Sequence, residues 1–166
     1  MKIESLLKDE IKGLFAKAAE SELYAHSLYQ HLANECQRIG LFGAQKYFLK
    51  ESEDELSHYR KLADFVNDMG GTLLVPPVSA ITDEVKTISD AIELAYEAEL
   101  SLMKQYSSFY EEAEDKYEDC VTATFLIEFL QIQRKSVGEY LDLAARLNLG
   151  GDIYAFDKYM GKLAEK

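Results

Sequence analysis

The chain has 166 residues, 48% of them hydrophobic, which is enough for one domain with a sizeable core and gives no sign of a second domain. Its formal net charge of -12 argues against nucleic-acid binding, because phosphates would repel such a surface. An acidic surface is compatible with collecting cations, although acidity alone more commonly serves solubility.

Helical periodicity covers almost the whole chain. A first helix is predicted over about residues 6–37, where one face is apolar except for Glu22. A second helix is predicted over about residues 44–69, and its stripe has a wider polar break that includes Glu55 and His58. This second helix ends in the usual way, at a pair of glycines.

The segment after the second helix, residues 70–87, contains both prolines and has no helical period. We therefore predict a connection here, with Thr82 or Asp83 as the cap of the next helix. A third helix follows from Ile88, and one polar residue, Glu99, interrupts its apolar face.

A fourth helix is predicted from about Val121 to near Gly150, with its polar break at Gln133. The residues from Asp152 onward have the pattern of a short fifth helix. Each of the four long helices thus carries a polar break in its buried stripe.

The polar breaks are expected at one height in a bundle. Residues at equal height in an antiparallel hairpin are equally far from the turn, so Glu22 and Glu55 place the first turn near residues 38 and 39. Glu99 and Gln133 place the second turn at residue 116 in the same way, inside a polar run. Each break is then roughly 25 Å from its turn, and the connection could stretch to roughly 60 Å. We predict an all-α four-helix bundle with a long crossover between helices two and three.

A buried helix face excludes carboxylates unless their charge is compensated, and a metal ion is one way to do so. Glu55 and His58, at positions i and i+3, can offer a carboxylate and an imidazole to one ion. Two further carboxylates and an amide suit iron better than zinc, whose structural sites use cysteine and histidine. The set predicts a di-iron site with an open position for dioxygen, and its other members are Glu22, Glu99 and Gln133.

Two neighbouring residues have more than one interpretation. Tyr29, two turns after Glu22, is either a core tyrosine or a redox or hydrogen-bonding residue at the site. Glu51, one turn before Glu55, is an extra carboxylate that either holds iron transiently or faces a polar partner.

The two cysteines, Cys36 and Cys120, match no metal-binding spacing, so we interpret them as reduced thiols of a cytoplasmic protein. The sequence does not exclude a disulfide between them. No stretch approaches the length of a membrane span, and residues 1–12 lack the hydrophobic segment of a secretory leader. We expect neither membrane nor nucleic acid among the partners.

Several segments resemble one known family across nearly the whole chain. SELYAHSLYQHLA, EDELSHYRKLADF followed by GG, YEAELSL and FLIEFLQIQRKSVGEYL resemble ferritin, and the tail FDKYMGKL resembles the ferritin C-terminal helix. Ferritins are hollow shells of two dozen subunits that oxidise Fe(II) and store it as a ferric mineral. The resemblance therefore implies a homo-oligomeric cage whose substrates are Fe(II) and either dioxygen or hydrogen peroxide.

Carried over by position, the resemblance implies two iron ions per subunit that share one bridging carboxylate, Glu55. It assigns Glu22 and His58 to the first iron, Glu99 to the second with Gln133 close to it, and Tyr29 to the catalytic tyrosine beside the centre.

Departures from related patterns narrow the expected subtype to a non-haem ferritin of the heavy-chain-like bacterial or archaeal type. Bacterioferritins and rubrerythrins have a second E-x-x-H on the fourth helix, where this chain has Gln133 and no histidine. Haem-binding bacterioferritins carry methionine after the bridging glutamate, where this chain has Leu56, so no haem is expected. DNA-protecting mini-ferritins build their site at a subunit interface from the first two helices, which Glu99 and Gln133 argue against.

Other family sites are expected to be altered. The third iron site of many bacterial ferritins is predicted to be absent or changed, because only its first carboxylate has a counterpart, Asp54. Of the positions that carry the mineral-nucleating carboxylates in animal heavy chains, only Asp54 is a carboxylate in this chain. Glu118 and Asp119 either offer another entry route or belong to a solvated turn. The remaining positions carry Ile132, Lys135 and Ser136 at the third site, Ser57 and Arg60 at the nucleation site, and Ala123 and Leu126 at the acidic entry channel.

We therefore expect residues 1–166 to form a single ferritin-like domain that oxidises and stores iron. Two alternatives stay open at this point. One is a small di-iron oxidase or peroxidase of the same fold that stores no mineral. The other is a non-catalytic helical assembly in which the polar residues form a buried hydrogen-bond network.

Overall fold

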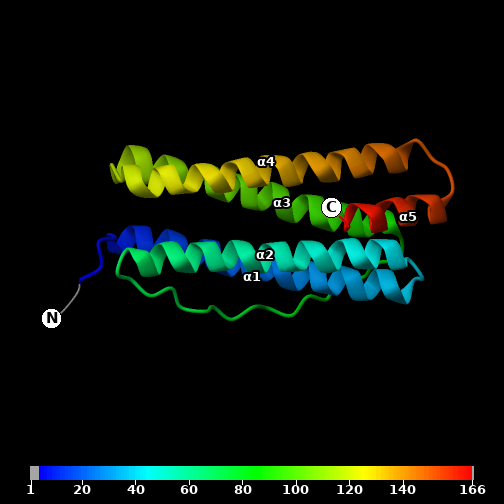
Figure 1. Cartoon of the computed structure of the whole chain (residues 1–166), viewed down its shortest axis with the longest axis horizontal. Coiled ribbons are helices and arrows are strands. Elements are labelled where there is room, and N and C mark those ends of the chain that lie inside the picture. Colours follow the sequence, from blue (N-terminus) through cyan, green and yellow to red (C-terminus); the bar gives the residue numbers. More distant parts are fainter. Residues whose placement is uncertain (1–3, 166) are drawn as a thin grey trace.

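The structure is a computed structural model that describes residues 4–165. Two long helical hairpins pack side by side along their whole length, and a short helix lies against one end (Figure 1). No strand occurs among the described residues, so the predicted all-α bundle is confirmed. The helices are α1 (Asp9–Arg38), α2 (Phe42–Asp68), α3 (Ile88–Glu111), α4 (Cys120–Asn148) and α5 (Ile153–Leu163).

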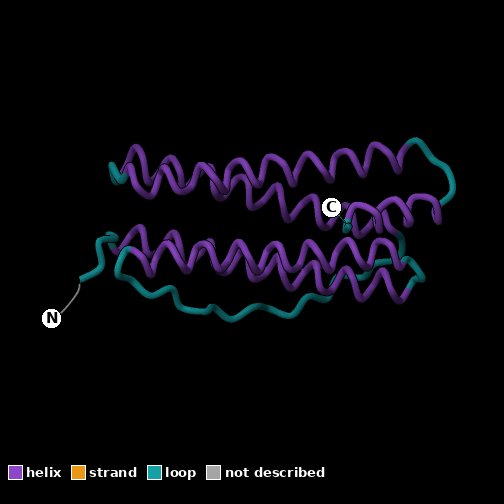
Figure 2. The backbone as a smooth tube through the Cα atoms, in the orientation of Figure 1, coloured by secondary structure: helices purple, strands orange, loops and turns teal. Residues whose placement is uncertain are grey.

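The connection between α2 and α3 runs the length of the bundle, from the end of α2 to the start of α3 (Figure 2). The predicted long crossover is therefore confirmed. As a result α1 and α3 are antiparallel, and all four long helices can contribute side chains at the same depth (Figure 1). In this described part of the chain no helix is both long enough and apolar enough to cross a bilayer.

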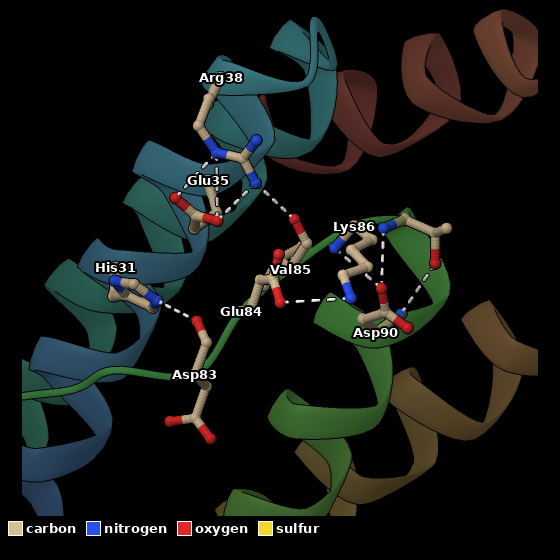
Figure 3. Close-up of polar contacts among 9 residues, drawn as sticks. His31, Glu35, Arg38, Asp83, Glu84, Val85, Lys86 and Asp90 are labelled. Atoms are coloured by element: carbon tan, nitrogen blue, oxygen red, sulfur yellow. Dashed lines mark hydrogen bonds and ion pairs between the residues drawn. The ribbon is translucent and has the colours of Figure 1, made fainter.

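The last residues of the crossover are tied to α1 (Figure 3). Arg38 Nη2 donates a 2.7 Å hydrogen bond to the carbonyl of Val85 and forms a 2.7 Å ion pair with Glu35. A ring nitrogen of His31 lies 2.8 Å from the carbonyl oxygen of Asp83. With the fully buried Val85 side chain, these contacts fix the point at which α3 starts.

The cap of α3 differs from the prediction. Neither Thr82 nor Asp83 caps this helix, because Thr87 does. The Thr87 hydroxyl accepts from the amide of Asp90 at 3.3 Å, and the Asp90 carboxylate accepts from the amide of Thr87 at 2.8 Å. This reciprocal capping box satisfies two amides that a lone Thr82 or Asp83 would leave free.

The two tight turns lie where the equal-height construction predicted them. Gly40 adopts a positive φ of 85° between α1 and α2, a conformation that favours glycine. α3 continues into a π-helical segment, Glu112–Lys116, and the chain then turns over residues 117–119, where Glu118 adopts a positive φ of 52°. α1 begins at Asp9, later than predicted, because the preceding residue, Lys8, is extended.

α5 closes the bundle by packing against α2. The Asp157 carboxylate accepts hydrogen bonds from the amides of Gly43, at 3.0 Å, and Ala44, at 2.7 Å. It thereby caps the first turn of α2, which has no cap of its own. The helices approach so closely here that a Cβ on Gly43 would lie 1.9 Å from the Asp157 carbonyl oxygen.

We predict opposite effects for two glycine-to-alanine changes. Gly43→Ala should destabilise the protein by about 1–3 kcal/mol, because backbone atoms must move apart. Gly138→Ala, in α4 with open space around the position, should stabilise it by about 0.5–1 kcal/mol. Chemical denaturation of both variants checks this, and equal stabilities would contradict the close helix approach.

Candidate metal centre

The polar breaks predicted from the sequence are buried in the middle of the bundle. Glu22, Glu99 and Gln133 have no exposed surface, and Glu55 is 2% exposed. The His58 side chain is 13% exposed. These five residues come from all four long helices: α2 directs two polar groups inward, and each of the other three helices directs one.

Three of these side chains form a compact group. Ligand atoms of Glu22, Glu55 and His58 all lie within 4.8 Å of one another. His58 Nδ1 is 3.4 Å from Glu55 Oε2 and 3.5 Å from Glu22 Oε2. Nitrogen and oxygen ligands lie about 2.0–2.2 Å from a metal such as zinc, so atoms at these separations can surround one ion. Within residues 4–165 this is the one such group of three potential ligands.

Two tyrosines hold the carboxylates from opposite helices. The Tyr29 hydroxyl donates to Glu99 Oε1, and the Tyr106 hydroxyl donates to Glu22 Oε1. Each tyrosine is seven residues after a glutamate on its own helix and bonds the glutamate of the other helix. This crossed pair orients one oxygen of each carboxylate and leaves the other free to bind an ion.

Tyr106 has a part in the site that the sequence analysis did not assign to it. Its signal was its spacing: Tyr106 follows Glu99 by seven residues, as Tyr29 follows Glu22. The hydroxyl of a fully buried tyrosine needs a hydrogen-bond partner. The matching spacing in the two hairpins points to the glutamate of the other hairpin as that partner.

Several buried polar atoms make no hydrogen bond to the described residues. Among the residues of the predicted centre they are Oε2 of Glu22, Oε2 of Glu99 and both side-chain amide atoms of Gln133; the others are Oε1 of Gln105 and the hydroxyl of Tyr140. An unsatisfied buried polar group costs about 1–3 kcal/mol, and charged groups cost more. Oxygen donors left free beside a histidine are a fitting ligand set for a hard or borderline cation.

Burial dominates the ionisation of the site. It raises the pKa of Glu55 well above its ordinary range, although the His58 contact opposes this. Burial raises the pKa of Glu99 to about 8, with the Tyr29 hydrogen bond opposing and the Glu22 charge adding. Burial would lower the pKa of His58, but its contacts with Glu22 and Glu55 outweigh this and raise it to about 10. A bound cation would displace these protons.

Residues at the positions of the family's third iron site and entry channel interact with other groups in this structure. Asp54 pairs with Lys50 at 2.7 Å, and Lys135 lies 3.6 Å from Glu139 on α4. Asp119, one of the candidates for iron entry, caps α4 by accepting from the amide of Thr122 at 3.0 Å. The other positions named for the entry channel, Ala123 and Leu126, are buried.

The fold and the site define a class: a four-helix bundle whose core contains a carboxylate and histidine centre. A family model described as a ferritin-like domain matches residues 14–149. Soma ferritin of Lymnaea stagnalis is 32% identical over 144 residues, covering 82% of each chain. A probable bacterial non-heme ferritin-like protein of Haemophilus influenzae is 22% identical, covering 97% of this chain and 99% of its own.

Solved structures agree. An open-pore ferritin from Archaeoglobus fulgidus superposes with a TM-score of 0.88 at 25% identity, covering 95% of this chain and 97% of its own. A humanized archaeal ferritin gives a TM-score of 0.90 at 25% identity, covering 96% and 98%. The chain belongs to the ferritin-like family, and the non-haem ferritin resemblance found in the sequence is confirmed.

We predict that the metal-free protein becomes less stable as the pH rises. The pKa of Glu99 increases on folding from 4.5 to about 8, and that of His58 from 6.5 to about 10, so the folded state holds more protons between these values. The stability contributed by these protons is lost as the pH rises through those windows.

Thermal melts in a chelator, from about pH 5 to pH 9, measure this slope. Glu99→Gln keeps an acceptor for the Tyr29 hydroxyl and removes the ionisable group. Its melting temperature should therefore exceed that of the wild type by an amount that grows with pH. Identical pH profiles for the two proteins would contradict the assignment.

Proposed function

We propose that the protein binds two Fe(II) ions per subunit at the buried centre, oxidises them, and stores the product as a ferric mineral inside a hollow homo-oligomeric shell. Supporting this are membership of the ferritin-like family and the buried carboxylate oxygens that lack hydrogen-bond partners. The latter observation carries the proposal, because it concerns this chain's own residues. Iron is a substrate here, and dioxygen or hydrogen peroxide is the oxidant.

The residues have distinct roles in this proposal. Glu22 and His58 hold the first iron, Glu99 holds the second, and Glu55 bridges the two. Each Fe(II) gives one electron to the oxidant. Carboxylates are hard ligands that stabilise Fe(III) more than Fe(II), so they favour this oxidation. Gln133 stands beside the second iron as a neutral oxygen donor, which limits the negative charge that the bundle must bury.

Tyr29 and Tyr106 position the carboxylates. Their hydroxyls donate to Glu99 and Glu22, and burial raises the pKa of both tyrosines well above 10. Both therefore remain hydrogen-bond donors at neutral pH. Tyr29 is also placed to act as a redox-active side chain beside the second iron, as the family resemblance implies.

A purely structural hydrogen-bond network would satisfy the buried polar atoms internally. Here Gln133 makes no side-chain hydrogen bond to the described residues, and each of Glu22 and Glu99 has one oxygen unsatisfied. These free atoms support a metal centre over a non-catalytic assembly. A small di-iron oxidase of the same fold would keep the centre, so particle size and mineral content separate it from a storage protein.

Replacing two proposed ligands should abolish rapid oxidation. In Glu55→Ala/His58→Ala, the first-turnover rate of Fe(II) oxidation should fall at least about a hundredfold, since even changes outside the ligand shell cost 10–100-fold. Glu53→Ala, an exposed glutamate on the same helix, is the matched control and should keep the wild-type rate. Stopped-flow absorbance after mixing with aerated buffer measures the rate.

Circular dichroism and size-exclusion chromatography on the same samples establish that both variants fold and assemble. Unchanged oxidation in the double variant would sink the assignment of the centre. Rapid oxidation by a small particle that accumulates no mineral would instead favour the di-iron oxidase.

A further inference from the structure

A pocket of about 320 Å³ lies between α1, the crossover and α3. It shares no lining residue with a groove of about 540 Å³ beside α2 and α4, which is lined by Glu55 and His58 of the candidate centre. The two openings therefore lie against different helices. A concave space of this size accommodates a small organic molecule.

Small side chains keep the pocket open. Ser21 and Ala25 lie one turn apart on α1, and Ala98 and Ser101 lie one turn apart on α3. Side chains of this size do not fill the space between the two helices, and residues 77–79 of the crossover form the third wall. The hollow is thus built into the packing of three separate segments of the chain.

The most buried part of the pocket lining is apolar. Ala25 and Leu102 are 1% and 4% exposed. Tyr24 is 39% exposed and contributes an aromatic side chain to the lining, and Val78 of the crossover adds an aliphatic one. These groups suit the apolar body of a ligand, because contact with them removes apolar surface from water.

The polar groups of the lining favour a cationic ligand. Glu20 is exposed, and among the described residues that line the pocket it is the one charged residue. Oε1 of Gln105 is buried and accepts no hydrogen bond from the described chain. A carboxylate and an unsatisfied carbonyl oxygen both attract a positively charged donor, and the net charge of -12 repels anions.

Glu20 and Tyr24 are neighbours on one face of α1, at positions i and i+4, where Cβ atoms lie about 5–6 Å apart. An ammonium ion between them gains an ion pair with the carboxylate and a cation–π contact with the ring. Gln105 is on the facing helix at nearly the same depth, because the Tyr106 hydroxyl donates to Glu22. Its carbonyl oxygen can accept a hydrogen bond from the same ligand.

We propose that this pocket binds a small organic ammonium ion whose aromatic or branched apolar body lies on Ala25 and Leu102. The charged nitrogen lies between the Glu20 carboxylate and the Tyr24 ring. The site uses neither iron nor the residues of the buried centre, so it goes beyond the proposed function. An anion of the same shape is repelled by the carboxylate.

Benzylamine, which is protonated at neutral pH, is a probe of this class, and benzyl alcohol has the same shape without the charge. Saturation-transfer difference NMR on the intact assembly measures both. Benzylamine should bind saturably with a dissociation constant of about 1 mM, and benzyl alcohol about fivefold more weakly. Glu20→Gln should weaken benzylamine about fivefold and leave benzyl alcohol unchanged. Glu10→Gln, at an exposed position on α1 outside the pocket lining, is the matched control and should bind both probes like the wild type.

Ser101→Leu fills the pocket from α3. Its larger side chain should weaken both probes at least about tenfold, because it occupies their space. Ser108→Leu, at an exposed position on the same helix outside the lining, is the control and should bind like the wild type. Wild-type protein that shows no saturable benzylamine binding, or that binds benzyl alcohol as tightly, would overturn the ammonium site. Unchanged binding in Ser101→Leu would do the same, and none of these results bears on iron oxidation.

Discussion

Three glutamate carboxylates meet at the centre of this bundle, and the free-energy cost of removing them from water is the constraint on which the rest of the structure depends. Glu22 and Glu99 have no exposed surface, and Glu55 has almost none. Water would hydrate each charge strongly, whereas the apolar stripes around these residues cannot. Hydrogen bonds from two tyrosine hydroxyls, contacts with a histidine and protonation of carboxyl groups offset part of this free-energy cost. Under the proposed function, a bound cation offsets the rest.

The fold determines where the proposed ligands meet. The long crossover makes α1 and α3 antiparallel, so two glutamate and tyrosine pairs with the same seven-residue spacing can bond reciprocally across the core. α2 then adds Glu55 and His58 from one face, with the groove beside α4 as their access to the surface. Helices hold each of the proposed ligands, which would suit a site that exchanges its ions repeatedly without losing its geometry.

Much of this architecture could be predicted from the sequence, because helix period and chain connectivity are local properties. The four polar breaks and the positions of both turns followed from residue spacing alone. Features that depend on tertiary contact were missed. One local signal was missed as well: the spacing of Thr87 and Asp90, which form the capping box of α3, could be read from the sequence. Tyr106 looked like an apolar core residue until its hydroxyl had a partner. The cap that Asp157 gives to α2 joins residues more than a hundred positions apart.

The central claim is that the buried carboxylates exist to hold two iron ions. Anomalous diffraction at the iron absorption edge, from crystals soaked with Fe(II) without oxygen, tests it most directly. We predict two peaks in each subunit, one among Glu22, Glu55 and His58 and the other between Glu55 and Glu99. A map with no peak beside Glu55, in crystals that bind iron elsewhere on the protein, would contradict the claim.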